Sequence, residues 1–131
     1  MTVYVETSAA AKLLVDEAES TALAAALDKL ADDEIRLVSS MPLETELRRL
    51  AVRHELSQTD VTKLLDRFEL FELDRAVYVS AGLLPGPQLR SLDALHIAVA
   101  LRVGAESMIA YDIQKTNSAR AVGLRVLAPC S

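Results

Sequence analysis

Short apolar runs that suit β-strands alternate along this chain with longer segments that suit α-helices. The expected strands are residues 3–6, 35–38, 70–73, 107–111 and 124–127. The expected helices are residues 8–14, 16–32, 42–54, 57–69, 79–83, 89–101 and 118–122. Because parallel strands are joined by crossover helices, this alternation predicts an α/β layer fold built on a parallel sheet.

Length and composition predict a single globular domain over residues 1–131. A chain of this size buries about two-thirds of the surface that it exposes when unfolded. Apolar residues make up 51% of the chain and charged residues 25%, which excludes a disordered protein. The only cysteine, Cys130, permits no internal disulfide and suits a reducing compartment.

The first twenty residues resemble a signal peptide only superficially, because Glu6 and Lys12 interrupt the apolar run. No run approaches the ~18 apolar residues of a membrane span, so we expect a cytoplasmic protein without a membrane partner. The net charge of −5 argues against a protein that coats polyanions. It leaves nucleic acid open as a substrate, because an acidic pocket can hold cations that meet the phosphate.

The expected helix at 89–101 carries one carboxylate in apolar surroundings. Asp93 and Ile97 lie on one stripe of the helix surface, and His96 lies beside that stripe. Nearly all the other side chains around the helix are Leu, Ala or Val. Such a helix is usually buried, and a buried carboxylate needs a partner or a metal ion. The simpler interpretation is that Ser91 caps the helix and that the helix dipole favours Asp93 by roughly 0.3–1 kcal/mol.

Further acids stand near the carboxyl ends of the expected strands, where ligands gather in an open parallel sheet. Glu6 ends the first strand and Asp112 follows the fourth. Glu44 and Glu46, which a helical wheel separates only weakly, open the helix after the second strand, and Asp93 opens the helix before the fourth. Each acid alone has an ordinary explanation as a strand-end, turn or helix-dipole residue. Together they would repel one another unless a divalent cation neutralised them, and oxygen-only ligands suit Mg²⁺ or Mn²⁺.

Other chemistries fit the sequence less well. The four glycines form no phosphate-binding loop, and one cysteine with two distant histidines makes zinc a poor fit. Ser8 has no obvious His–Asp relay, because His54 and His96 both lie in expected helices. We expect His96 to be a packed helix residue or a local hydrogen-bond partner. A phospho-accepting signalling domain stays open as an alternative, although the third strand is weak and the last leads into Ala128-Pro129.

Four segments resemble those of PIN domains, and together they span almost the whole chain. The segments are VYVETSAAAKLL at 3–14, SSMPLETELRRL at 39–50, LRSLDALHIAVAL at 89–101 and IAYDIQKTNSARAVGLRVLAPC at 109–130. The third of these segments is the most specific. The size of the chain and its lack of added domains look like the VapC-type toxins of bacterial toxin–antitoxin pairs.

This resemblance implies a three-layer α/β/α fold with a mostly parallel, about five-stranded sheet. It also implies a Mg²⁺-dependent endoribonuclease, in which Mn²⁺ can replace Mg²⁺, acting as the toxin of a type II toxin–antitoxin system. Glu6, Asp93 and Asp112 would bind the metal directly or through water, and Glu46, which the motif favours over Glu44, would be a ligand or the general base.

The same resemblance implies supporting residues and partners. Thr7 and Ser8 would brace the acidic site. The candidate phosphate contacts are Lys12, Arg48, Arg49 and Arg90. The implied partners are an RNA substrate, a cognate antitoxin that blocks the acidic hollow, and a second copy of the chain in a homodimer.

Two departures from the family pattern stand out. The first acid is normally Asp and here is Glu6, which is one methylene longer; Gln114 and Lys115 stand where many members carry a further acid. The site is therefore expected to be less negative, to hold one ion rather than two, or to work slowly with a preference for Mn²⁺. The alternative is a weak or inactive PIN-like module that binds an antitoxin or RNA.

Overall fold

The five strands form one sheet in which every neighbouring pair is parallel, in the order β3-β2-β1-β4-β5. The computed structural model describes residues 1–130 of the chain. The strands are β1 (Thr2–Val5), β2 (Arg36–Ser40), β3 (Glu69–Phe71), β4 (Ser107–Ile109) and β5 (Arg125–Leu127). Each begins and ends within two residues of its expected position. The predicted parallel sheet is confirmed, and its pairings are all parallel.

The strand order creates a switch point beside the central strand. The chain leaves β1, adds β2 and then β3 on one side, and returns to add β4 and β5 on the other side. The connections on the two sides of β1 therefore run in opposite directions, and a crevice forms at the carboxyl ends of β1 and β4. Glu6 follows β1 directly, and the backbone N–H of Glu6 donates to Ile109 at the end of β4.

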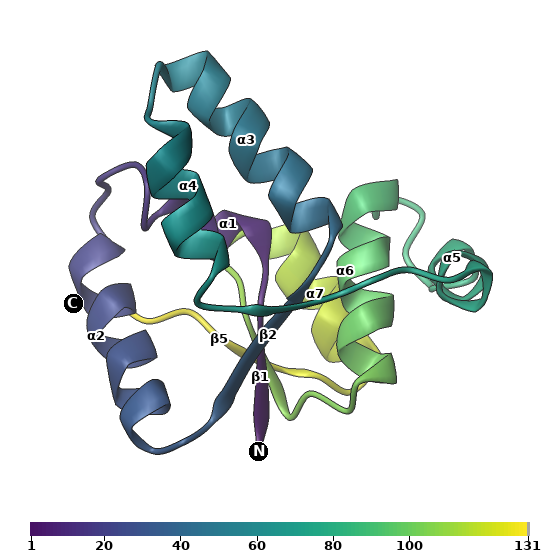
Figure 1. Ribbon diagram of the computed structural model, residues 1–131. Helices are drawn as coiled ribbons and strands as arrows, with labels where there is room; N and C mark the ends of the chain where they lie inside the picture. The colour runs from purple at the N-terminus through teal and green to yellow at the C-terminus, as the bar shows by residue number, and fades with distance from the viewer. Residues whose placement is uncertain (131) are drawn as a thin grey trace.

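Seven helices cover the two faces of the sheet among the described residues (Figure 1). One core contains Val3 and Val5 together with residues from α1 (Thr7–Ala11), α2 (Ser20–Asp32), α3 (Pro42–His54) and α4 (Gln58–Leu65). The other core contains Tyr4 together with residues from α5 (Arg75–Gly82), α6 (Ser91–Arg102) and α7 (Ile113–Ala121). Successive side chains of β1 thus enter opposite cores, as a pleated strand requires. The three-layer α/β/α arrangement is confirmed.

The helix boundaries differ from expectation where a capping residue decides them. Helix α5 begins at Arg75 because an Asp74 carboxylate oxygen accepts a hydrogen bond from the N–H of Val77, at 3.1 Å. Helix α7 begins at Ile113, five residues before the expected start, because Asp112 caps it in the same way. The prediction that Ser91 caps α6 is wrong: Arg90 holds that position, and its side chain makes no capping bond.

Helix α2 is shorter than the sequence suggests. It begins at Ser20 rather than Asp16, because the hydroxyl of Ser20 donates to the carbonyl of Lys12 at 2.6 Å and accepts from the N–H of Glu17 at 2.9 Å. These bonds hold residues 12–19 in a non-helical connection. Among residues 1–130, no helix combines the length and the apolar character that crossing a membrane requires.

Candidate active site

Glu6 is the most enclosed acid of the predicted site, with 1% of its surface exposed. It is the N-cap of α1, and its Oε2 accepts from the backbone N–H of Ser8 at 2.9 Å and from the Ser8 hydroxyl at 2.5 Å. The same hydroxyl accepts from the backbone N–H of Tyr111 at 3.0 Å. Ser8 therefore fixes one side of the Glu6 carboxylate and ties the chain after β1 to the chain after β4.

The second oxygen of Glu6 contacts a lysine. Nζ of Lys115, in the first turn of α7, lies 2.6 Å from Oε1 of Glu6 and 3.2 Å from Oδ1 of Asp93. Burial alone would lower the pKa of Lys115, but the two carboxylates outweigh burial and hold the pKa above its ordinary value. Burial raises the pKa of Asp93 even though the Lys115 ammonium opposes the shift. One ammonium group thus serves two carboxylates and leaves Asp93 incompletely compensated.

Glu46 has a different partner on α6. Its Oε1 lies 2.8 Å from Nε2 of His96, whose side chain has no exposed surface. Thr7 Oγ1 lies 3.1 Å from the same nitrogen. Burial would raise the pKa of Glu46, but the hydrogen bond and charge of His96 outweigh it, so the pKa lies below its ordinary value. Glu46 is therefore held in its ionised form.

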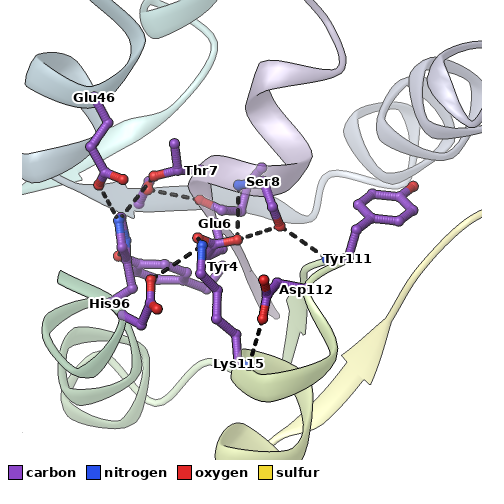
Figure 2. Close-up of polar contacts among 12 residues, drawn as sticks. Tyr4, Glu6, Thr7, Ser8, Glu46, His96, Tyr111, Asp112 and Lys115 are labelled. Carbon is purple, nitrogen blue, oxygen red and sulfur yellow. Dashed lines mark hydrogen bonds and ion pairs between the residues drawn. The ribbon is translucent and has the colours of Figure 1, made fainter. Parts of the chain in front are cut away.

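The other ring nitrogen of His96 continues a chain of buried hydrogen bonds. The Tyr4 hydroxyl lies 2.6 Å from Nδ1 of His96 and 2.7 Å from Oγ of Ser40. Burial raises the pKa of Tyr4, so the hydroxyl stays protonated between Nδ1 and Ser40. Where that hydroxyl donates to Nδ1, Nε2 carries a hydrogen and donates to Glu46. Figure 2 shows Glu46 meeting His96 on one side of the site, while Lys115 extends from α7 toward Glu6 on the other.

Three of the predicted acids line one surface hollow of about 510 Å³, and the fourth, the buried Glu6, is joined to it through Lys115. It is lined by Glu46, Arg90, Ser91, Leu92, Asp93, Asp112, Gln114 and Lys115. Asp112 is exposed there, and its Oδ1 accepts from the backbone N–H of Lys115 at 3.1 Å, so its capping role and its place in the hollow coexist. Glu44 does not line the hollow; its carboxylate pairs with Arg48, one turn along α3, at 3.0 Å.

Of the candidate phosphate contacts, Arg90 is exposed and lines the hollow. The others lie elsewhere or are engaged by acids. Lys12 pairs with Glu17 and Glu19, and its ammonium lies 4.7 Å from the centre of the Tyr111 ring. Arg48 pairs with Glu44, and Arg49 is an exposed residue of α3.

The predicted ligands offer carboxylate oxygens, which are the atoms that a hard divalent cation prefers. In this structure Glu6 and Asp93 instead contact the ammonium of Lys115. Within residues 1–130, accordingly, no three His, Cys, Asp or Glu side chains are grouped so as to hold a metal ion. The position between Glu6 and Asp93 is nevertheless occupied by a positive charge, the ammonium of Lys115, whose pKa the two carboxylates raise.

Comparison with known sequences identifies the family. The sequence pattern of the family described as "PIN domain" matches residues 3–116, which is most of the chain. The chain belongs to the PIN-domain family.

Relatives of this PIN domain align along nearly its whole length. It is 38% identical over 133 residues to ribonuclease VapC35 of Mycobacterium tuberculosis, with 97% of this chain and 96% of the relative covered. It is 32% identical over 130 residues to ribonuclease VapC46 of the same organism, with 97% of each covered. The resemblance to VapC-type proteins is thereby confirmed.

Solved structures with the same fold are more distant in sequence. A structure of VapBC2 from Rickettsia felis bound to a DNA fragment from its promoter has a TM-score of 0.75 at 17% identity, covering 97% of this chain and 98% of that one. A structure of FitAB bound to an IR36 DNA fragment has a TM-score of 0.69 at 18% identity, covering 95% and 93%. These likenesses concern the fold of the PIN domain.

Sequence reasoning missed two features of the site in this PIN domain. Lys115 was noted only as a departure from the family pattern, and its contacts with Glu6 and Asp93 were not anticipated. The hydrogen-bond chain through Tyr4 and Ser40 was also missed. A lysine in place of an expected acid was the available signal for the first; the second had none, because Tyr4 and His96 are 92 positions apart.

Proposed function

We propose that this PIN domain is a metal-dependent endoribonuclease that acts in the cytoplasm as the toxin of a type II toxin–antitoxin pair. The observation that carries the proposal is that Glu46, Asp93 and Asp112 line one hollow at the switch point of the sheet, and that Lys115, which also lines it, contacts the buried Glu6. Its relatives named ribonuclease VapC support RNA as the substrate.

The four carboxylates would hold Mg²⁺ or, in its place, Mn²⁺. When bound, such an ion lowers the pKa of a water molecule and stabilises the charge that develops on a phosphate in the transition state. Glu6, Asp93 and Asp112 would contact the ion directly or through water. Oxygen ligands of this kind are those that Mg²⁺ prefers.

Glu46 would bind the ion or accept a proton from the attacking water. Its pKa is held below the ordinary value, so the carboxylate is ionised and able to accept a proton. His96 fastens Oε1 of Glu46, and Glu46 lines the hollow. Arg90, exposed at the rim, would contact a phosphate of the RNA.

The proposed partners are an antitoxin and a second copy of the chain. The neighbouring structures are titled as VapBC2 and FitAB bound to DNA fragments, which supports a protein partner for this chain as well. We propose that the antitoxin covers the acidic hollow, since blocking the carboxylates would stop both metal binding and RNA binding. The homodimer is an expectation from the family.

The decisive test is cleavage of a panel of RNAs with Mg²⁺ and with EDTA. We expect internal cleavage that EDTA abolishes and that Asp93→Asn lowers by at least ~10²-fold. Because burial raises the pKa of Asp93, the neutral Asn should keep or raise the melting temperature in EDTA. Asp60→Asn is the matched control: Asp60 also lies in the first turn of a helix but is exposed on α4.

Equal cleavage by Asp93→Asn and the parent would refute the metal site and leave Asp93 as a helix-dipole residue. A parent protein that binds an antitoxin but cleaves no RNA with either Mg²⁺ or Mn²⁺ would instead favour the inactive binding module. The contact of Lys115 with Glu6 and Asp93 is the observation that keeps this second function open.

A further inference from the structure

We infer that the Lys115 ammonium is a tethered counter-ion, which neutralises Glu6 and Asp93 in the metal-free protein and must be displaced before a divalent cation can bind them. This inference rests on the proposed function, since it concerns the same hollow. It assigns to Lys115 a role in setting metal affinity, which a surface lysine does not have.

The first argument is the geometry of the contacts. Lys115 contacts one oxygen from each carboxylate: Oε1 of Glu6 at 2.6 Å and Oδ1 of Asp93 at 3.2 Å. Ser8 already holds Oε2 of Glu6 through two hydrogen bonds. Glu6 is thus held on both sides, and a cation that binds Glu6 and Asp93 together must take the position of the ammonium.

The second argument is the balance of charge. Glu6 is almost fully buried and Asp93 has a side chain only 16% exposed, so their mutual repulsion is poorly screened. Lys115 supplies one positive charge against two carboxylates. A doubly charged ion would compensate both carboxylates more fully, which makes displacement of the ammonium favourable when the ion is present at sufficient concentration.

The third argument is that Lys115 can leave without unfolding the helix that carries it. The backbone N–H of Lys115 is fixed by Asp112, and α7 continues to Ala121. The side chain lines the open hollow and is 15% exposed, so its four-carbon stem has a path toward solvent. Displacement of the ammonium therefore breaks two ion pairs but leaves helix α7 intact.

The test measures Mn²⁺ affinity by electron paramagnetic resonance and melting temperature in EDTA, on the full chain. Lys115→Met should raise Mn²⁺ affinity by about tenfold or more, because the competing charge is gone. It should also lower the melting temperature in EDTA by roughly 5 °C or more, because Glu6 loses its partner. Lys115→Arg, which keeps the charge, should stay near the parent in both measurements.

The control for loss of a lysine charge is Lys29→Met, an exposed position on α2, which should change neither measurement. If Lys115→Met does not fold, Lys115→Gln replaces it. In the Asp93→Asn background, where less repulsion remains, Lys115→Met should lower the melting temperature less than it does in the parent. This last comparison requires no metal.

Unchanged or weaker Mn²⁺ affinity in Lys115→Met, in a protein whose parent binds Mn²⁺ and cleaves RNA, overturns this inference alone. A melting temperature in EDTA that does not respond to Lys115→Met also overturns it. If neither parent nor variant binds Mn²⁺ and neither cleaves RNA, the proposed function fails and the displacement inference fails with it.

Discussion

The acids at the carboxyl end of the sheet fall into two groups that the protein stabilises in different ways. Glu6 and Asp93 share the ammonium of Lys115, which reaches them from α7. Glu46 is paired instead with His96, a fully buried partner that is itself held by Tyr4. The first group depends on a charge that can move away, and the second on hydrogen bonds that cannot rearrange without disturbing the core.

The two groups meet two different requirements of a site that binds a cation. The Lys115 group leaves the pKa of Asp93 raised, so it gains most from a stronger positive charge. The His96 group holds the pKa of Glu46 low and fixes one of its oxygens. We therefore interpret the first group as the adjustable half of the hollow and the second as the rigid half.

The largest expected effect distinguishes Glu46 from its neighbour Glu44. Glu46→Gln should lower RNA cleavage by on the order of 10²–10³-fold, because the amide neither binds a metal strongly nor accepts a proton. Glu44→Gln should leave the cleavage rate near the parent value, since Glu44 pairs with Arg48 outside the hollow. An equal loss of cleavage in both variants, or a larger loss in Glu44→Gln, would contradict the assignment of Glu46 rather than Glu44 to the site.

The second prediction concerns the rigidity of the His96 group. His96→Phe should lower the free energy of unfolding by roughly 2–4 kcal/mol, because the buried Tyr4 hydroxyl then keeps only Ser40 as a partner and the Glu46 carboxylate loses its bond to His96. Chemical denaturation in EDTA measures this loss. The double variant His96→Phe with Tyr4→Phe should recover part of it. A loss well below 1 kcal/mol would show that the hydrogen-bond chain contributes little.

The third prediction concerns the unusual length of Glu6. Glu6→Asp should raise Mg²⁺-dependent cleavage several-fold, because Asp caps a helix well and its shorter side chain withdraws from Lys115. The expectation assumes that the backbone resembles that of family members with Asp at this position. A fall in activity would indicate a backbone adapted to Glu, and activity unchanged by both Glu6→Asp and Glu6→Gln would exclude Glu6 as a ligand.

The smallest expected effect is on the pH dependence of stability in EDTA. The pKa of Glu46 is lowered, so its contribution is present above the unfolded-state pKa and is lost as the pH falls through the folded-state pKa. The pKa of Asp93 is raised, so its ionisation removes stability as the pH rises. Glu46→Gln should therefore flatten the rise in unfolding free energy from acid to neutral pH, whereas Asp93→Asn should steepen it. Slopes that change in the same direction would contradict the division into two groups.

Local patterns in the sequence predicted the elements from which the site is built. Pro42 at the first turn and an apolar stripe located α3 at Pro42–His54, as expected. Short apolar runs located all five strands, because the strands of a parallel sheet covered on both faces are rich in apolar residues. The misplaced starts of α5 and α7 reflect caps at Asp74 and Asp112, whose side chains also suit turns.

The sequence by itself determined the fold class, the acidic residues and the strand ends near which they stand, because each follows from periodicity and from the rule for parallel sheets. Only the tertiary structure decided the partners of those acids. Lys115 is 109 positions from Glu6, and His96 is 50 positions from Glu46. A long side chain can reach in many directions, so which groups meet depends on the packing of α3, α6 and α7 around the end of β1.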